Sequence, residues 1–245
     1  MMMLLAAAFF LPLFPASAVF NALYARASHP VLRAFLLLAW PQIGVYILGV
    51  AGGTPPPGVV PLALATAGLY ALRMLATRDM QTWTAFLATG TWALIWTFSQ
   101  REPAELHELA LATSVSLVLL SSVAASVTRR FGAAYAGFPG GLAANTPRLA
   151  GVLAVAALIA VGTPPGMPFF VLLHGLVGGS PAHAVAFALV WFVWSWAAIR
   201  LIQGMLVGEA SGETVADLRT GGAWMYALAC IGLVCAGFAY AGGVL

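Results

Sequence analysis

The sequence predicts an all-α fold, namely a polytopic bundle of about eight transmembrane helices. Hydrophobic residues make up 62% of the 245 residues and charged residues only 7%, and the mean hydropathy is +0.98. Soluble globular domains carry about 25% charged residues, so the composition excludes that class. A transmembrane helix needs about 20 mostly apolar residues, because it must satisfy its own backbone polar groups inside the hydrocarbon core.

Eight apolar stretches come close to this requirement and follow one another with mostly short connections. In chain order they are Met1 to Phe20, Val31 to Gly52, Val59 to Thr77, Met80 to Ser99, Leu106 to Thr128, Leu149 to Gly178, Ala182 to Gly208 and Ala223 to Leu245. No segment between them is long or polar enough to fold as a separate soluble domain. We therefore expect residues 1–245 to form a single membrane domain.

The basic residues, ten arginines and no lysine, predict the orientation in the membrane. With eight spans, only Arg101 falls on one side. The other nine fall in or beside loops on the opposite side: Arg26, Arg33, Arg73, Arg78, Arg129, Arg130, Arg148, Arg200 and Arg219. Cytoplasmic loops carry an excess of Lys and Arg. We expect a multi-pass protein of the cell inner (cytoplasmic) membrane with both termini outside.

The first span has a competing interpretation as a signal peptide. Ala16-Ser17-Ala18 follows an apolar run and resembles a signal-peptidase site. However, no Lys or Arg precedes the run, and cleavage would leave Arg26 and Arg33 outside, against the charge asymmetry of every later loop. A retained helix is therefore favoured.

Prolines predict a discontinuous helix in the sixth span. Pro164, Pro165 and Pro168 lie close together there, and each removes a backbone donor and clashes with the preceding turn. Such breaks are tolerated in lipid where neighbouring helices or a water-filled cavity satisfy the freed carbonyls, and transporters place ion sites at them. The alternative is a re-entrant turn or a loop between two half-spans. Pro41 in the second span and the two prolines of the first predict milder disturbances.

Three segments resemble motifs of one membrane protein family, and they occur in the same order. Ala27-Ser-His-Pro-Val31 with Gln42-Ile-Gly-Val-Tyr46 resembles the motif A-P-T-P-V-S…K-x-G-x-Y. Thr77-Arg-Asp-Met-Gln-Thr82 with the following Ala-Phe resembles T-D-x-K-R-x-x-A-Y, and Gly162-Thr-Pro-Pro165 with a double Phe resembles G-x-P-P-x-x-G-F-x-x-K/E. These are motifs of the antiporter-like subunits of respiratory complex I, Mrp antiporters and inorganic-carbon uptake complexes.

This resemblance implies that the eight spans correspond to the seventh to fourteenth helices of a fourteen-helix subunit. The chain would then represent the C-terminal half, without the first six helices. It also implies a role in a multisubunit proton- or ion-coupled complex, with membrane or soluble subunits as partners in addition to the lipid bilayer. No cofactor and no nucleic acid partner are expected.

The resemblance implies a proton relay of buried lysines and a glutamate, and this chain lacks those lysines. Where the resemblance places family Lys or Glu residues, this chain has Gln42, Gln81 and Leu172, and a further lysine falls near Leu117. Glutamine can hydrogen-bond but cannot titrate. We therefore expect Gln42 and Gln81 to be polar groups of an ion path without proton storage.

His174, in the broken span, is the candidate replacement for a relay group, because the unperturbed pKa of histidine is about 6.5. The alternative is a histidine near the outer helix end that hydrogen-bonds to water or a carbonyl. In the fourth connection, Glu102, Glu105, His107 and Glu108 are expected to be solvated around a helix start rather than to bind a metal.

Several charged residues are candidates for partner contact. Arg200 either snorkels to the membrane surface or faces an acidic residue of a partner. Glu209, Glu213 and Asp217 recur every four residues and are expected on one helix face, as a solvated stripe or a docking edge. The serines of the fifth span (Ser116, Ser121, Ser122 and Ser126) suit close helix packing.

The sequence contains no nucleotide-binding loop, zinc spacing or nucleophile triad, so no metal site and no enzyme activity of the chain's own are expected. Three hypotheses follow. The first is a membrane subunit that holds partners together or supplies part of an ion path without its own lysine relay. The second is an active translocator that uses His174 and charges from partners. The third is a stand-alone small-solute transporter or a lipid-binding membrane protein whose similarity to the family is coincidental.

Overall fold

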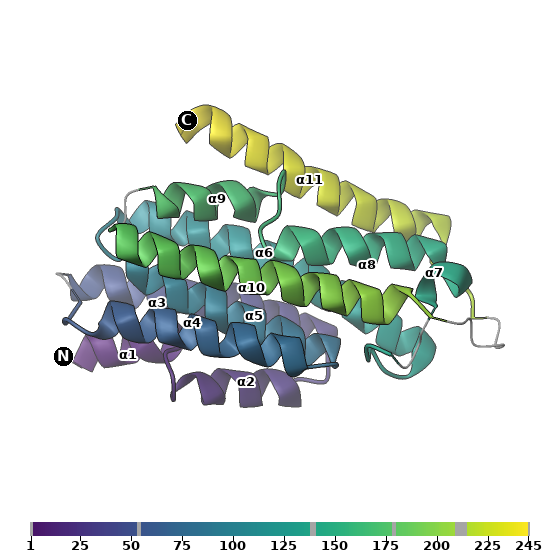
Figure 1. Cartoon of the computed structure of the whole chain (residues 1–245), viewed down its shortest axis with the longest axis horizontal. Coiled ribbons are helices and arrows are strands. Elements are labelled where there is room, and N and C mark those ends of the chain that lie inside the picture. The colour runs from purple at the N-terminus through teal and green to yellow at the C-terminus, as the bar shows by residue number, and fades with distance from the viewer. Residues whose placement is uncertain (1, 53–54, 138–140, 178–179, 209–214, 245) are drawn as a thin grey trace.

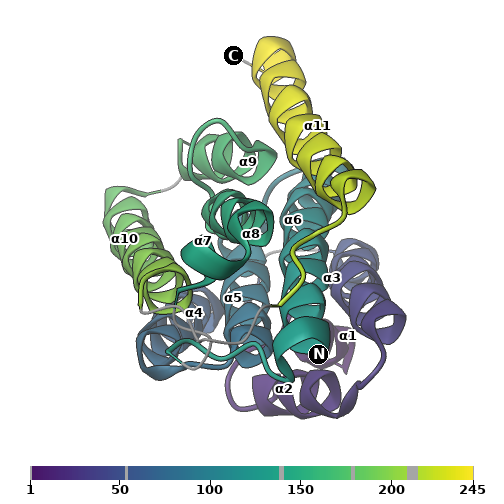
Figure 2. The ribbon, with the colours of Figure 1, turned by 90° about the vertical axis from the view of Figure 1, so that its right-hand side faces the viewer.

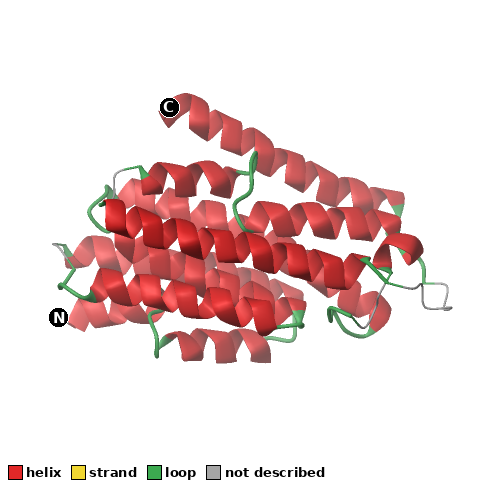
Figure 3. Cartoon of the chain, in the orientation of Figure 1, coloured by secondary structure: helices red, strands yellow, loops and turns green. Residues whose placement is uncertain are grey.

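The computed structural model describes residues 2–52, 55–137, 141–177, 180–208 and 215–244. Within these ranges the protein is a bundle of helices without a β-strand (Figures 1 and 3). Five helices are long and apolar enough to cross a membrane. They are α3 (Pro30–Ala51), α4 (Val59–Ala76), α6 (Pro103–Phe131), α10 (Pro181–Leu206) and α11 (Thr220–Val244). The predicted all-α membrane bundle is therefore confirmed.

The other three expected spans consist of shorter elements. These are α1 (Met2–Phe10) with α2 (Ser17–Arg26), α5 (Met80–Leu94) with the 3-10 helix η1 (Ile95–Phe98), and α8 (Pro147–Ala160) with α9 (Met167–Leu176); a single turn, α7 (Leu142–Asn145), precedes α8. Because five helices of the described ranges are individually long enough, the count of about eight spans stays a prediction.

The bundle is organised around α5 and α6, which lie in its middle when it is viewed from one end (Figure 2). Every residue of α5 except Thr82 is buried. In the most apolar stretch of α6, 78% of the residues are buried, against 17% in α11. The remaining helices surround this pair, and α11 lies at the edge, mainly against α8 and α9. Polar groups on the buried faces of α5 and α6 are therefore shielded from lipid.

The predicted break in the sixth span is confirmed. The chain leaves α8 at Ala160, passes through Pro164 and Pro165, and re-enters a helix at Met167, with Pro168 in the first turn of α9. Figure 1 shows α8 and α9 following one another in the same direction, so this segment does not turn back.

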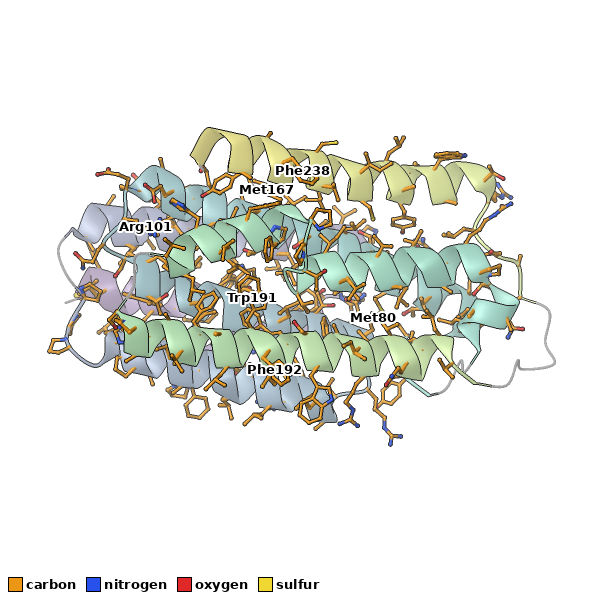
Figure 4. The ribbon with its side chains drawn as sticks, turned by 45° about the horizontal axis from the view of Figure 1, so that its top comes forward. Met80, Arg101, Met167, Trp191, Phe192 and Phe238 are labelled. Carbon is orange, nitrogen blue, oxygen red and sulfur yellow. The ribbon has the colours of Figure 1, made fainter. Side chains whose placement is uncertain are left out.

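Side chains satisfy the carbonyls that this break releases. The indole nitrogen of Trp191, on α10, donates to the carbonyl of Val161 at 2.9 Å, and the hydroxyl of Thr163 donates to the carbonyl of Leu158 at 2.8 Å. Figure 4 shows Trp191 on the side of α10 that faces the bundle, opposite Phe192. The break is thus held by hydrogen bonds that need no lipid or solvent.

The first span is also broken, and more strongly than its two prolines predicted. Residues 11–16 separate α1 from α2. At this break the indole nitrogen of Trp96 donates to the carbonyl of Leu11 at 3.0 Å, and the amide of Phe14 donates to the hydroxyl of Thr66 at 3.1 Å. By contrast, Pro41 lies inside the continuous helix α3.

Helix α11 approaches the second break closely at a glycine. A Cβ atom on Gly237 would lie 2.8 Å from the carbonyl oxygen of Pro165 and 2.9 Å from the amide nitrogen of Met167. Both contacts are with backbone atoms, which cannot rotate away. Close helix packing through small residues is common in membranes.

We therefore expect Gly237→Ala to weaken the packing of α11 on the break and to lower stability by about 1–3 kcal/mol through overpacking. The matched control is Gly232→Ala in the same helix, where a Cβ meets no atom within 4 Å. Both changes gain the same helix propensity, so the difference between their melting temperatures in mild detergent isolates the contact. Equal melting temperatures would contradict the proposed packing.

Candidate functional site

Gln81 is the most fully bonded of the predicted polar residues. It is the second residue of α5 and is buried. Its Oε1 accepts hydrogen bonds from the Tyr24 hydroxyl at 2.9 Å and the Ser121 hydroxyl at 3.0 Å, and its Nε2 donates to the Ser121 carbonyl at 3.0 Å. The side chain thus joins α2, α5 and α6 through neutral groups only.

A cavity of about 300 Å³ adjoins Gln81. Arg33 and Asp79 supply its charged groups, and Asn21, Tyr24 and Thr82 are among its polar lining residues. Asp79 is the N-cap of α5, because its carboxylate accepts from the amide of Thr82 at 2.7 Å and from the hydroxyl of the same residue at 2.6 Å. The guanidinium of Arg33 lies 5.6 Å from the centre of the Tyr24 ring.

The cavity is therefore a polar space beside the first broken helix, large enough to hold water.

Gln42 is hydrogen-bonded to a histidine. It lies near the middle of α3, and its Oε1 is 2.6 Å from Nδ1 of His107, while its Nε2 donates to the His107 carbonyl at 3.3 Å. The sequence grouped His107 with a solvated acidic segment, but the structure places it half-buried in the first turns of α6, against α3. His107 is the functional candidate that sequence reasoning missed.

Three polar residues share one face of α6, and we call them the α6 polar row: His107, Ser114 and Ser121. They recur every seven residues, which places successive members on nearly the same face and about 10 Å apart. At one end of the row, His107 contacts Gln42. At the other end, about 21 Å away along α6, Ser121 is hydrogen-bonded to Gln81. Ser114 is buried, and its hydroxyl makes no hydrogen bond among the described residues. The seven-residue spacing was the signal in the sequence that could have revealed this row.

His174 lies near the C-terminal end of α9, in a charged group that we call the Arg101 cluster (Arg101, Glu105 and His174). Arg101 donates to the Glu105 carboxylate at 3.1 Å and to the His174 carbonyl at 2.8 Å. The His174 Nε2 is 3.9 Å from the same carboxylate. Figure 4 shows Arg101 at one end of the bundle. The three predicted polar residues, Gln42, Gln81 and His174, therefore occupy three separate hydrogen-bonded groups.

Two positions where the resemblance places lysines are packed apolar residues. Leu117 on α6 is 0% exposed and Leu172 on α9 is 1% exposed. A buried leucine cannot store a proton, so these positions contribute packing rather than titration.

The candidates for partner contact differ in how they are placed. Arg200 is exposed on α10 and lines a hollow of about 570 Å³ with residues of α4. Glu209 and Glu213 lie outside the described residues. The expectation of a helical stripe is wrong at Asp217, which is not in a helix.

The reason is that Asp217 caps α8. Its carboxylate accepts from the amide of Arg148 at 2.9 Å and from the amide of Leu149 at 3.2 Å. The first amides of a helix have no partner within the helix, and a carboxylate satisfies them well. Across the described ranges, no group of three His, Cys, Asp or Glu residues is placed to hold a metal ion.

No protein-family model and no curated protein sequence matches the chain. Solved structures do match. A chain of the Mrp complex from Dietzia sp. superposes with a TM-score of 0.82 and 16% identity, over 98% of this chain and 56% of that one. A chain of respiratory complex I from Thermus thermophilus gives 0.75 and 25% identity, over 96% and 53%.

A third match is a chain of the membrane-bound sulfane sulfur reductase, an archaeal respiratory membrane complex, with a TM-score of 0.78 and 17% identity. It covers 98% of this chain and 52% of that one. The chain thus spans about half the length of the solved chains it matches.

These matches and the helices define a multi-pass membrane protein. Mrp complexes and complex I are assemblies that the sequence motifs pointed to, so the resemblance to the antiporter-like subunit family is confirmed.

The hydrogen bonds of Gln81 lead to a stability prediction. Gln81→Ala leaves buried Tyr24 and Ser121 groups with fewer partners, and we expect a loss of about 1–3 kcal/mol. Gln203→Ala, at an exposed glutamine of α10, is the matched control and should be nearly neutral. Thermal unfolding of the purified chain in mild detergent measures both, and equal stability of the two variants would contradict the structural role.

Proposed function

We propose that the chain is a membrane subunit of a multisubunit proton- or ion-coupled complex. The observation that carries the proposal is the agreement in fold, over nearly the whole chain, with chains of an Mrp complex, complex I and the sulfane sulfur reductase. In this proposal the protein lies in the cytoplasmic membrane with both termini outside, as the arginine asymmetry predicts. Its partners are other membrane or soluble subunits, and any catalysis belongs to them.

Within such a complex the proposed role is to hold partners and to form part of an ion path without a lysine relay. The hydrogen bonds of Gln81 to neutral groups and the buried leucines Leu117 and Leu172 support this role, because none of these side chains titrates. The polar part of the path would be the cavity beside Gln81 and the α6 polar row, which meet at the hydrogen bonds between Gln81 and Ser121.

One contact favours the second hypothesis, active translocation. His107, whose side chain is of an ionisable type, is held 2.6 Å from Gln42 between α3 and α6. The histidine predicted from the sequence, His174 on α9, lies 3.9 Å from the Glu105 carboxylate of α6 and would be a second relay group in this alternative. In this alternative, Gln42 orients the imidazole of His107, and charges from partner subunits complete the relay.

The first test is to extract the protein from its native membrane in mild detergent and to identify co-purifying chains by mass spectrometry. Redox or hydrogenase-type subunits would place it in a complex I-like assembly, and a zinc-containing carbonic-anhydrase-like subunit would place it in inorganic-carbon uptake. Recovery of a stable monomer without partners would overturn the proposal and favour a stand-alone transporter.

The two hypotheses make opposite predictions for single substitutions in the native complex. If the chain has no relay of its own, Gln42→Ala, Gln81→Ala, His107→Ala and His174→Ala leave ion transport nearly unchanged once it is normalised to the amount of assembled complex. Loss of an obligatory proton carrier would instead lower transport by about 100-fold or more. Transport is measured in membrane vesicles, and such a loss from either histidine variant would favour active translocation.

The second helix break is expected to matter for assembly. Replacing Pro164 and Pro165 together by Ala favours a continuous helix and displaces the segment on which α11 packs. We expect less of the variant to be recovered with its partners. Pro56→Ala with Pro57→Ala, in the connection before α4, is the matched control, and equal recovery of the two double variants would argue against this role.

A further inference from the structure

A groove of about 980 Å³ runs between α6 and α11. It exists because α11 lies mainly against α8 and α9 and touches α6 only weakly (Figure 2). Apolar residues line most of its length, with Val115 and Leu119 on α6 and Met225 on α11 among them. Met225 is 74% exposed and Val115 is 38% exposed, so both walls are accessible from the lipid side.

One end of this groove is strongly basic. Arg129 and Arg130 lie in the last turn of α6, and Arg219 directly precedes the first residue of α11. Among the described residues, no carboxylate forms an ion pair with any of the three. Asp217 also lines this end, but both of its oxygens accept bonds from backbone amides of Arg148, Leu149 and Leu218.

The arginines at this end are positioned by neutral groups. Arg129 donates through Nη2 to the Ser126 hydroxyl at 2.9 Å, and that hydroxyl is 2.7 Å from the hydroxyl of Tyr226, on α11. Arg130 donates through Nη1 to the Ser126 carbonyl at 3.0 Å and through Nε to the Ala216 carbonyl at 3.2 Å. Each guanidinium therefore keeps further N–H donors beyond those bonds.

We propose that this groove binds an anionic glycerophospholipid. The headgroup phosphate is held by Arg129 and Arg219, with Arg130 beside them, and an acyl chain lies along the apolar walls. Guanidinium groups bind phosphate with paired hydrogen bonds. Basic pockets between transmembrane helices on the cytoplasmic side are typical sites for anionic headgroups, and the arginine asymmetry predicts that side here.

The distribution of charge favours a lipid over a helix of a partner subunit. Apolar residues such as Val115 and Leu119 line the groove along α6, and its three arginines lie together at one end. This placement matches a molecule that carries its charge at one end and an acyl chain at the other. The inference does not rest on the ion-path role proposed above, although it uses the same membrane orientation.

The test uses the full-length chain in detergent, with fluorescent phosphatidylglycerol as the probe and fluorescent phosphatidylcholine as the neutral headgroup control. We expect phosphatidylglycerol to bind at least about tenfold more tightly, since each arginine near an anionic lipid contributes on the order of 1 kcal/mol. The variant Arg129→Gln with Arg219→Gln should lose this preference. The matched control, Arg26→Gln with Arg78→Gln, removes two exposed arginines elsewhere and should keep it.

Three outcomes would overturn the proposal. Equal binding of the two lipids would contradict the proposed contact between the arginines and the headgroup. An equal loss of the preference for phosphatidylglycerol in both double variants would indicate an effect of general surface charge rather than binding in the groove. Competition by millimolar inorganic phosphate as effective as that by unlabelled phosphatidylglycerol would indicate a simple anion site. A photo-crosslinker placed at Met225 in the native complex gives an independent readout: crosslinks to lipid support the proposal, and crosslinks mainly to another subunit would assign the groove to a partner helix.

Discussion

The structure depends on how backbone polar groups are satisfied where helices break inside the bundle. An unpaired carbonyl in hydrocarbon costs several kcal/mol, so a broken span persists only if another helix supplies the missing partner. Both breaks use the same solution: an indole N–H from a neighbouring helix donates to a released carbonyl, from Trp96 to Leu11 and from Trp191 to Val161. Tryptophan suits this role, because its large ring packs against apolar neighbours while its single donor reaches the backbone. The breaks are therefore parts of the tertiary fold, as stable as the helices that hold them.

The need to satisfy buried polar groups within the protein also explains which partners the polar side chains have. With most of α5 and α6 enclosed by the other helices, their buried polar side chains can find partners only within the protein. Gln81 does so with hydroxyl and carbonyl groups of α2 and α6, whereas Gln42 does so with the imidazole and carbonyl of His107. The two glutamines occupy comparable places in the sequence motifs and yet have different surroundings. Their roles in an ion path should therefore be judged separately.

Some of these features could be predicted from local sequence. The composition, the lengths of the apolar stretches and the cluster around Pro164 and Pro165 predicted a helical membrane bundle with a discontinuous helix, and the motif order predicted the neighbours in fold. The break in the first span was underestimated, because its two prolines alone do not show that Trp96 and Thr66 stabilise an interrupted backbone.

The sequence by itself determined the class of the protein and the positions of its polar residues, because hydrophobic length, proline content and charge asymmetry are properties of continuous segments. Only the tertiary structure decided which of those residues meet. It paired His107 with Gln42, assigned Asp217 to the cap of α8, and left a basic-ended groove between α6 and α11. The physical reason is that each of these features joins residues far apart in the chain, and such contacts depend on how whole helices pack rather than on local sequence.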